Sequence, residues 1–310
     1  MGSAGVSVLK FFNQSRSMFL TCTVVPVALG GALAWQDTGV FHWGLFLLTL
    51  FGVSAAHLGV NLSNDFFDFR FGADQPETAE RAFSGGGGSL TRDKVNPNQV
   101  RRWFWTCFAV ALAAGLIILF QMTEGRGLVL AIMLLGFCGG YFYTAPPLRL
   151  AYRGWGELDI FFFLGPAPVL GTYAVQCGAL TWPTFVCSMP IAGLITALLW
   201  INEYSDFETD RLAGKSNLVV RLGRKNARWG FVALVVFIFG SVIYSVMRGF
   251  TPATFLIAWL PAPLALRSIT RAMRYYEDPK KISLAQADFL KVHLFAGLLC
   301  TAGVIIGKAI

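Results

Sequence analysis

Four polar side chains lie close together near residue 65 and could bind a cation. Asn61, Asn64 and Asp68 follow one another at offsets of three and four, with Asp65 beside Asn64. On a helix these offsets place the side chains on one face. Carboxylate and amide oxygens are the ligands that Mg²⁺ prefers, and Mg²⁺ is commonly shared between one or two carboxylates and substrate phosphates. This first polar stripe therefore predicts a magnesium site that acts on a phosphorylated substrate.

A second polar stripe follows later in the chain. It consists of Asn202, Asp206 and Asp210, each four residues after the last, while Glu203 and Glu208 fall off it. Basic residues that could bind an anion come after both stripes. These are Arg70, Arg81, Lys215 and Arg221. Metal ligands and basic residues beside an apolar membrane segment predict a substrate with a diphosphate head and a long lipid tail.

The composition indicates what positions these stripes. The chain has 310 residues, of which 55% are hydrophobic and 14% charged, as in a protein with several membrane spans. Its apolar runs are long and continuous, which predicts helices, since barrel strands would be short and alternating. About nine spans are expected, in a single domain covering 1–310. They lie near 17–36, 44–64, 103–121, 128–145, 158–176, 182–205, 229–247, 252–266 and 290–307.

The two stripes end the second and the sixth span, so both should lie on one side of the membrane. All but three of the 25 Lys and Arg residues precede the first span or lie in or beside the even-numbered loops. The exceptions are Arg126, Arg248 and Lys308. The positive-inside rule then predicts a cytoplasmic N-terminus and a cytoplasmic site, capped by loops near 68–102, 146–157 and 207–228. The first span is expected to be retained and not cleaved as a signal peptide.

Other functions fit the sequence less well. Basic residues scattered over short loops without a recognition motif argue against nucleic-acid binding. Six cysteines without a paired spacing predict neither disulfides nor a zinc site. The four glycines within residues 83–90 lack a following Lys-Ser or Lys-Thr, so they predict a hinge over the site and not a phosphate loop. His57 is expected to be a buried, hydrogen-bonded histidine, with a place in the site as the alternative.

Two explanations of the stripes compete with a metal site. Solvated helix ends are disfavoured because carboxylates at a helix C-terminus oppose the helix dipole. A cation-coupled transporter usually has its carboxylates near the bilayer midplane on broken helices, whereas these stripes end spans of the same direction. The last three spans carry no acidic residue and are expected to be scaffold. The acidic residues of the two stripes, by contrast, would be costly at the membrane edge unless they served a binding or catalytic site.

The residues around both stripes resemble the motifs of UbiA-family intramembrane prenyltransferases. NDFFD at 64–68 is similar to the first half of their NDxxDxxxD motif, and SDFETDRLAGK at 205–215 to their second aspartate motif. The likeness covers most of the chain. It departs where the commoner first motif has a third Asp and this chain has Gly72, with Asp74 two residues later.

Three stretches resemble one branch, the 1,4-dihydroxy-2-naphthoate polyprenyltransferases, which tend to have glycine at the position of Gly72. They are NLSNDFFDFRFGAD, YTAPPLRLAYRGWGEL and DFETDRLAGKSNLVVRLG. The resemblance implies helices around a central cavity open to the cytoplasm. It implies Mg²⁺-dependent transfer of a polyprenyl group from an allylic diphosphate to the naphthoate, with loss of diphosphate and CO2. The alternative acceptors are 4-hydroxybenzoate, homogentisate, a chlorophyllide, haem and a lipid-linked sugar.

The resemblance also implies roles for individual residues. One Mg²⁺ would be held by Asn64, Asp65 and Asp68, and another by Asn202, Asp206 and Asp210. The diphosphate would be bound by Arg70, Arg81 and Lys215. An allylic cation would be stabilised by aromatic rings, with Tyr143 and the Phe-rich fifth span as candidates. An acceptor carboxylate would be bound by Arg149 or Arg153.

Overall fold

The computed structural model describes residues 17–73, 90 and 95–310. All regular secondary structure in this part of the chain is helical, as predicted. Among the described residues, seven helical segments are long and apolar enough to cross a membrane. They are α3 (Trp43–Arg70), α4 (Pro97–Gln121), the pair α6 and α7 (Gly156–Cys177), α8 (Trp182–Leu212), α9 (Leu218–Met247), the pair η3 and α10 (Ala253–Tyr275) and α11 (Ser283–Ala309).

Two further helices, α2 and α5, correspond to the first and fourth predicted spans. They are α2 (Thr21–Thr38) and the shorter apolar α5 (Arg126–Phe142). The fifth predicted span is divided into α6 (Gly156–Phe163) and α7 (Pro166–Cys177). The break falls at Gly165 and Pro166, and Pro166 takes the first position of α7, where a proline is favoured because its missing N–H is not needed. The short 3-10 helices are η1 (Ser17–Leu20), η2 (Leu150–Tyr152) and η3 (Ala253–Trp259), and η3 leads into α10 (Ala262–Tyr275).

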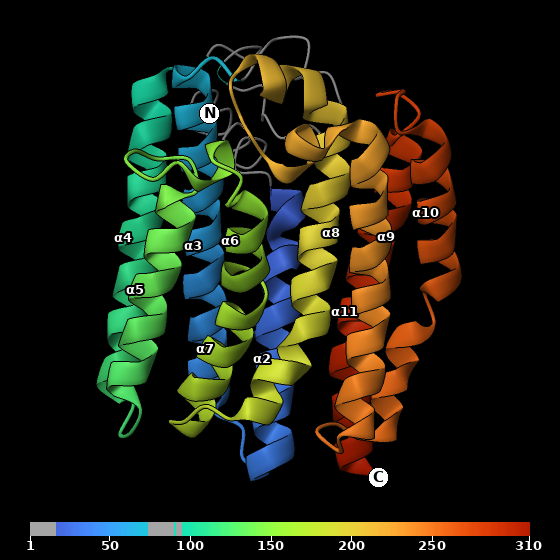
Figure 1. The fold of residues 1–310 in the computed structure, drawn as a ribbon. Coiled ribbons are helices and arrows are strands. Elements are labelled where there is room, and N and C mark those ends of the chain that lie inside the picture. The colour runs from blue at the N-terminus through green and yellow to red at the C-terminus, as the bar shows by residue number, and fades with distance from the viewer. Residues whose placement is uncertain (1–16, 74–89, 91–94) are drawn as a thin grey trace, which may run out of the picture.

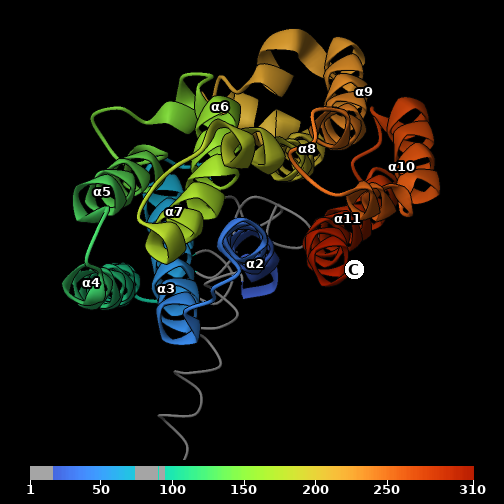
Figure 2. The same cartoon turned by 90° about the horizontal axis from the view of Figure 1, so that it is seen from below.

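The helices run side by side along one axis, and α8 lies among them (Figures 1 and 2). The most apolar window of α8 is 83% buried, against 50% or less in the other six candidate spans. The largest core cluster joins α2, α8, α9 and α11 around α8 residues such as Ile191 and Ile201. Because α8 is covered on several sides, the residues at its end are held by a rigid core.

The last helix differs from its prediction. It begins at Ser283, several residues before the expected start at 290, and so includes the buried Asp288. Asp288 accepts hydrogen bonds from Arg267 at 2.8 and 2.9 Å and from Arg271 at 2.6 Å. The predicted span 290–307 itself holds no acidic residue; the helix extends further toward its N-terminus than predicted, and paired arginines of α10 allow the Asp288 carboxylate to be buried there.

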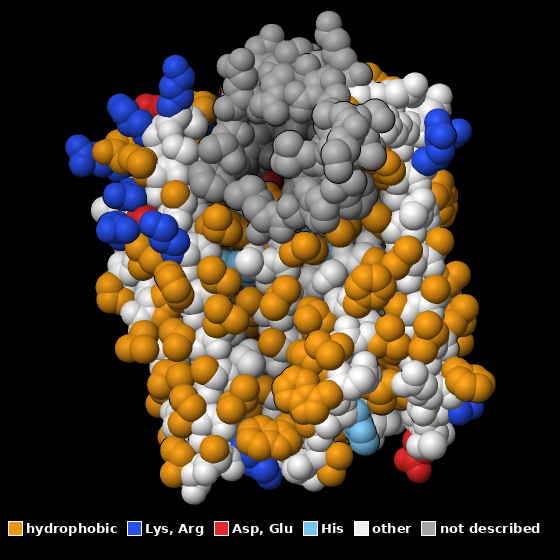
Figure 3. All heavy atoms as spheres, turned by 180° about the vertical axis from the view of Figure 1, so that it is seen from behind, with side chains coloured by type: hydrophobic (Ala, Val, Ile, Leu, Met, Phe, Trp, Pro, Cys, Tyr) orange, Lys and Arg blue, Asp and Glu red, His pale blue; other side chains and the backbone are white. Residues whose placement is uncertain are grey.

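Charge and hydrophobicity divide the molecule along its axis. On the face that Figure 3 shows, hydrophobic side chains cover the middle, and Lys and Arg gather over the upper end of α10 and α11. The ends of α3 and α8 lie at this same upper end, and the chain finishes at the lower end (Figure 1). The protein is therefore an all-helical integral membrane protein with its polar stripes near one end of the bundle.

Candidate active site

The helices that carry the two polar stripes end in the same way. Gly72 follows α3 with a φ of 73°, and the N–H of Ala73 donates to the carbonyl of Asp68 at 2.9 Å. Gly214 follows α8 with a φ of 75°, and the N–H of Lys215 donates to the carbonyl of Asp210 at 2.8 Å. This left-handed glycine with a six-to-one hydrogen bond is a common helix ending. Asp68 and Asp210 thus hold equivalent positions in two matching helix ends.

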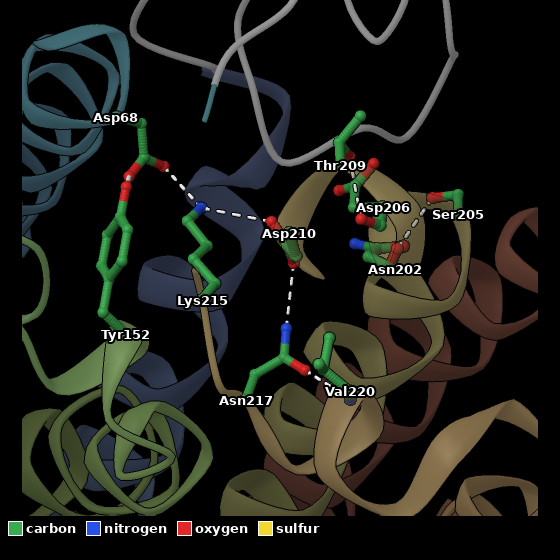
Figure 4. A network of polar contacts seen from close by, with 10 residues as sticks. All are labelled: Asp68, Tyr152, Asn202, Ser205, Asp206, Thr209, Asp210, Lys215, Asn217 and Val220. Carbon is green, nitrogen blue, oxygen red and sulfur yellow. Dashed lines mark hydrogen bonds and ion pairs between the residues drawn. The ribbon is translucent and has the colours of Figure 1, made fainter. Parts of the chain in front are cut away.

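Lys215 joins these two helix ends (Figure 4). Its Nζ donates to Asp68 Oδ2 at 2.8 Å and lies 3.5 Å from Asp210 Oδ1. The Lys215 side chain is 14% exposed, and Asp68 and Asp210 are buried. One ammonium therefore balances two buried carboxylates, which would repel each other without it.

Two neutral residues complete the hydrogen bonds of these carboxylates. The Tyr152 hydroxyl donates to Asp68 Oδ1 at 2.7 Å, and the Asn217 amide donates to Asp210 Oδ2 at 2.9 Å. The Asn217 side-chain oxygen also accepts from the N–H of Val220 at 2.8 Å, so it caps α9. The N–H of Ser216 donates to the carbonyl of Tyr152 at 3.1 Å and ties the two loops together. The loops after α5 and α8 therefore hold the carboxylates in place.

The electrostatics of the cluster follow from these contacts. Burial alone would lower the pKa of Lys215, but the carboxylates of Asp68 and Asp210 outweigh it and raise that pKa well above the usual lysine value. Burial, followed by the nearby Asp68 carboxylate, raises the pKa of the Tyr152 hydroxyl. Lys215 is therefore a permanent cation at neutral pH, and Tyr152 is a permanent hydrogen-bond donor.

The remaining residues of the stripes surround this cluster. Asn64 accepts a hydrogen bond from the Thr144 hydroxyl at 2.8 Å, and Asn202 accepts one from the Gln286 amide at 3.1 Å. Asn64, Asn202 and Asp206 line the same polar pocket as the cluster, whereas Asp65 is buried and is absent from its described lining. Figure 4 places Asn202 and Asp206 on α8, on the turns that precede Asp210.

The carboxylates and amides of the two stripes can be compared with the ligands that Mg²⁺ requires. No group of three or more His, Cys, Asp or Glu side chains in the described ranges converges as a ready metal site. Asp68 and Asp210 nevertheless flank one cationic centre, the Lys215 ammonium, and the amides of Asn64 and Asn202 lie in the same pocket. Mg²⁺ usually takes one or two carboxylates and completes its shell with water and phosphate oxygens. Asp68 and Asp210, with the amides of Asn64 and Asn202 nearby, fit a Mg²⁺ ion that is shared with a substrate phosphate.

The polar pocket opens onto a larger apolar cavity. The polar pocket has a volume of about 170 Å³ and the apolar cavity about 630 Å³. Six residues line both of them, which makes the two spaces continuous. They are His57, Asn61, Asn64, Tyr143, Ile160 and Leu164. The apolar cavity runs between α3, α4, α5, α6 and α7, so it could enclose a long hydrocarbon chain beneath the charged cluster.

Some predicted site residues lie elsewhere. Arg70 is exposed on the last turn of α3, and its guanidinium lies 5.7 Å from the centre of the Phe66 ring. Arg149 lies over the rings of Phe71 and Tyr152, at 3.9 and 4.1 Å. Neither arginine belongs to the described lining of the two spaces. Arg81, Asp74 and the glycine run at 83–90, apart from Leu90, lie outside the described residues.

The structure adds residues that were not among the predicted site residues. Besides Tyr152 and Asn217, these are three carboxylates on α6 and α8, Glu157, Asp159 and Glu203, all buried. Glu157 accepts a hydrogen bond from the N–H of Leu218 at the start of α9. Asp159 and Glu203 fall within the predicted spans 158–176 and 182–205, and a carboxylate inside a predicted span is the signal that could have indicated them. His57, whose Nδ1 is hydrogen-bonded to the Thr23 hydroxyl at 2.6 Å, is both buried and part of the site.

Comparison with known proteins agrees with this geometry. Residues 23–307 match the model of the UbiA prenyltransferase family. A 2-carboxy-1,4-naphthoquinone phytyltransferase from Synechocystis is 29% identical over 91% of this chain and 89% of its own length. A 1,4-dihydroxy-2-naphthoate octaprenyltransferase from Bacillus subtilis is 27% identical over 95% of this chain and 92% of its own.

Solved structures show the same fold. A UbiA homologue from Aeropyrum pernix aligns with a TM-score of 0.70 at 18% identity, covering 92% of this chain and 97% of its own. One from Archaeoglobus fulgidus bound to GPP and Mg²⁺ aligns with a TM-score of 0.64 at 16% identity, covering 97% and 100%. The continuous family match and the shared fold show that this chain belongs to the UbiA prenyltransferase family and is a membrane-embedded prenyltransferase.

Proposed function

We propose that this protein transfers a polyprenyl group from an allylic diphosphate to 1,4-dihydroxy-2-naphthoate. The observation that carries the proposal is the position of the Asp68, Lys215 and Asp210 cluster at the mouth of a continuous apolar cavity. A prenyl diphosphate has the same division, with a charged head and a hydrocarbon tail. The solved homologue with GPP and Mg²⁺ supports this class of donor.

The charged end of the donor would be bound at the cluster. Lys215 would bind diphosphate oxygens, with Arg70, Arg81 and Arg149 as further basic residues around the mouth. Asn64, Asp65 and Asp68 would hold one Mg²⁺, and Asn202, Asp206 and Asp210 a second. Bound Mg²⁺ would supply charge neutralisation of the leaving diphosphate. Before a donor binds, Lys215 keeps Asp68 and Asp210 from repelling each other.

The reacting end of the donor would lie where the two spaces meet. Breaking the allylic C1–O bond leaves a cation, which water would trap. The apolar Ile160 and Leu164 lie at the meeting point, and the cavity beyond it is lined mainly by apolar side chains, which would shield the cation from water. Tyr143 offers an aromatic face, and a cation–π contact contributes about 0.5 to 2 kcal/mol. Phe163 of α6 lies further along the same cavity.

The acceptor assignment rests on the relatives and on the first motif. Both relatives described above are named for naphthoate or naphthoquinone substrates. Gly72 takes a left-handed conformation at a helix end, which suits glycine better than the third Asp of the commoner motif. With the naphthoate as acceptor, the ring carbon that bears the carboxylate is attacked and CO2 is lost. Arg149 or Arg153 would bind that carboxylate as the ring enters.

We infer that the site faces the cytoplasm and that the N-terminus lies on the same side. All but three of the 25 basic residues precede the first span or lie in or beside the even-numbered loops, which supports this orientation. The C-terminal end of α11 lies at the opposite end of the bundle (Figure 1). A C-terminal alkaline phosphatase fusion should therefore be active in bacteria, and a C-terminal GFP fusion dark. The reverse pattern would overturn this orientation.

Prenyl transfer by purified protein tests the function. The assay contains Mg²⁺, geranylgeranyl diphosphate and either 1,4-dihydroxy-2-naphthoate, 4-hydroxybenzoate or homogentisate, with product identified by mass spectrometry. Prenylated, decarboxylated naphthoquinol is the expected product. Asp68→Asn with Asp206→Asn should abolish it, while Asp37→Asn, near the far end of α2, should not. A preference for another acceptor would overturn the naphthoate assignment, and no transfer to any acceptor would overturn the proposed function.

A further inference from the structure

One carboxylate in the apolar cavity is not explained by metal or diphosphate binding. Asp159 lies on α6, only 7% exposed, and lines the apolar cavity. Its Oδ1 atom has no hydrogen-bond partner among the described residues. A buried carboxyl group without a partner costs free energy, so a site that keeps one usually uses it.

The direction of this side chain differs from that of its acidic neighbour. Glu157 stands two residues earlier, and residues two apart on a helix do not share a face. Glu157 accepts from the N–H of Leu218 and so supports the start of α9, whereas Asp159 belongs to the cavity lining. Glu157 Oε2 also lacks a hydrogen-bond partner among the described residues, but Glu157 lines neither space, so Asp159 is the one of the two that is available to a ligand in the cavity.

Asp159 lies near the point where the polar pocket and the apolar cavity meet. Tyr143 lines both spaces, and its ring packs against Gly156 at the start of α6, the helix that carries Asp159. Ile160, the next residue after Asp159, lines both spaces as well. Asp159 is thus placed beside the position that the reacting carbon of the donor would take.

We propose that Asp159 accepts the proton of a ring hydroxyl on the aromatic acceptor as the new carbon–carbon bond forms. The inference rests on the proposed function and names the base for it. A hydroxyl group on the ring gives Asp159 the hydrogen-bond partner that its free oxygen lacks. It also fixes the ring at the meeting point of the two spaces.

The step balances as follows. The C1–O bond of the donor breaks, and the diphosphate leaves with that electron pair. A π electron pair of the ring forms the bond to C1, the O–H pair becomes the second bond of a ring C=O, and the proton moves to Asp159. The displaced ring carboxylate then leaves as CO2, and its electron pair restores the aromatic ring as the ring carbonyl takes up a proton. Asp159 is the source of that proton, so it is regenerated each turnover.

Asp159→Asn tests this role, because the amide keeps the shape but cannot accept the proton. The prediction is a fall in the rate of transfer of about 100-fold, within the range that general bases contribute. Binding of the prenyl diphosphate should change by less than about twofold, since Asp159 does not contact the charged cluster in the described hydrogen bonds. Asp159→Glu should recover at least part of the lost rate. Asp37→Asn is the matched control, and thermal unfolding in detergent checks folding.

The results for the Asp159 variants distinguish a failure of this inference from a failure of the proposed function. Transfer by Asp159→Asn within threefold of the wild type overturns the inference and leaves the proposed function standing. Loss of donor binding together with transfer also overturns it, because Asp159 then acts through the diphosphate site. If the Asn variant does not fold, Asp159→Ser is judged by the same criteria. If the wild type itself transfers to no aromatic acceptor, the proposed function fails and this inference fails with it.

Discussion

Lys215 and Asp68 are 147 residues apart in the sequence, yet the lysine Nζ donates to the aspartate Oδ2 at 2.8 Å. This contact links the end of α8 to the end of α3 and brings the two polar stripes into one site. Asp210 completes the arrangement from the second stripe at 3.5 Å. A lysine between two aspartates is therefore the centre of the site. Substitutions in this cluster should show which contacts serve diphosphate binding and which serve folding stability.

Replacing Lys215 should weaken the diphosphate site most. Lys215→Met removes the only cation within 4 Å of Asp68 and Asp210 in the described part of the chain. We expect kcat/KM for the prenyl diphosphate to fall by about 100-fold, which corresponds to about 2.7 kcal/mol. The exposed Lys225→Met is the matched control and should retain wild-type rates. A Lys215→Met enzyme with an unchanged kcat/KM would remove Lys215 from the site.

The effect of pH on stability should show that Lys215 stays charged. Its pKa is raised in the folded protein, so the stability it contributes is fully present below the ordinary lysine pKa of about 10.4 and is lost only as pH rises through the raised value. The difference in melting temperature between the wild type and Lys215→Met should therefore stay constant from about pH 7.5 to 9.5. A difference that shrinks steadily over this interval would show that the lysine loses its proton there.

Tyr152→Phe tests the hydrogen bond to Asp68 Oδ1. The variant keeps the ring that lies under Arg149 and removes only the hydroxyl. A hydrogen bond to a charged group contributes about 1.5 to 3 kcal/mol, so the unfolding temperature should fall and the Mg²⁺ dependence of the rate should change. Tyr244→Phe, on α9, serves as the control for loss of a hydroxyl. Equal stability of the two variants would contradict the structural role of Tyr152.

Asn217 has two functions that can be separated by substitution. Asn217→Ser keeps a good helix cap for α9 but loses the amide that donates to Asp210. Its stability should stay close to that of the wild type while its rate falls by about tenfold, or about 1.4 kcal/mol. Asn217→Ala loses both contacts and should also be destabilised by about 1 kcal/mol. Full activity in the serine variant would show that the contact with Asp210 is unimportant for catalysis.

Gly214→Ala tests the helix ending that places Asp210 and Lys215. A Cβ in the left-handed conformation costs about 1 to 2 kcal/mol, so this variant should unfold at a lower temperature. Gly240→Ala is the comparison, since Gly240 lies inside α9 and a Cβ there meets no neighbouring atom within 4 Å. That change should be neutral or stabilising. Equal effects of the two substitutions would show that the ending at Gly214 is not required.

Much of the fold was predictable from the sequence because continuous apolar runs identify membrane helices directly. The helical class, the ends of α3 and α8, and the break near Pro166 follow from such local signals. The acidic start of α11 was missed because Asp288 depends on arginines of another helix. The transporter alternative was wrong, as the family match shows a prenyltransferase.

The site was predictable only where its residues form a local pattern. Spacing along a helix indicated Asp68, Asp206 and Asp210, and the basic residue after the second stripe indicated Lys215. Tyr152 and Asp159 could not be found in this way. Their contacts are set by how the loop after α5 and helix α6 fold over the site, and the order of residues in one segment does not specify that packing.

Mg²⁺-dependent binding of an inert prenyl diphosphate tests the central claim most directly. The probe is a geranylgeranyl thiolodiphosphate, in which sulfur replaces the bridging oxygen, and binding is followed by calorimetry on purified protein in nanodiscs. The wild type and Asp37→Asn should bind it tightly only with Mg²⁺, and Asp68→Asn and Asp210→Asn should each bind at least about tenfold more weakly. Unchanged affinity in both aspartate variants would contradict the assignment of this cluster as the diphosphate site.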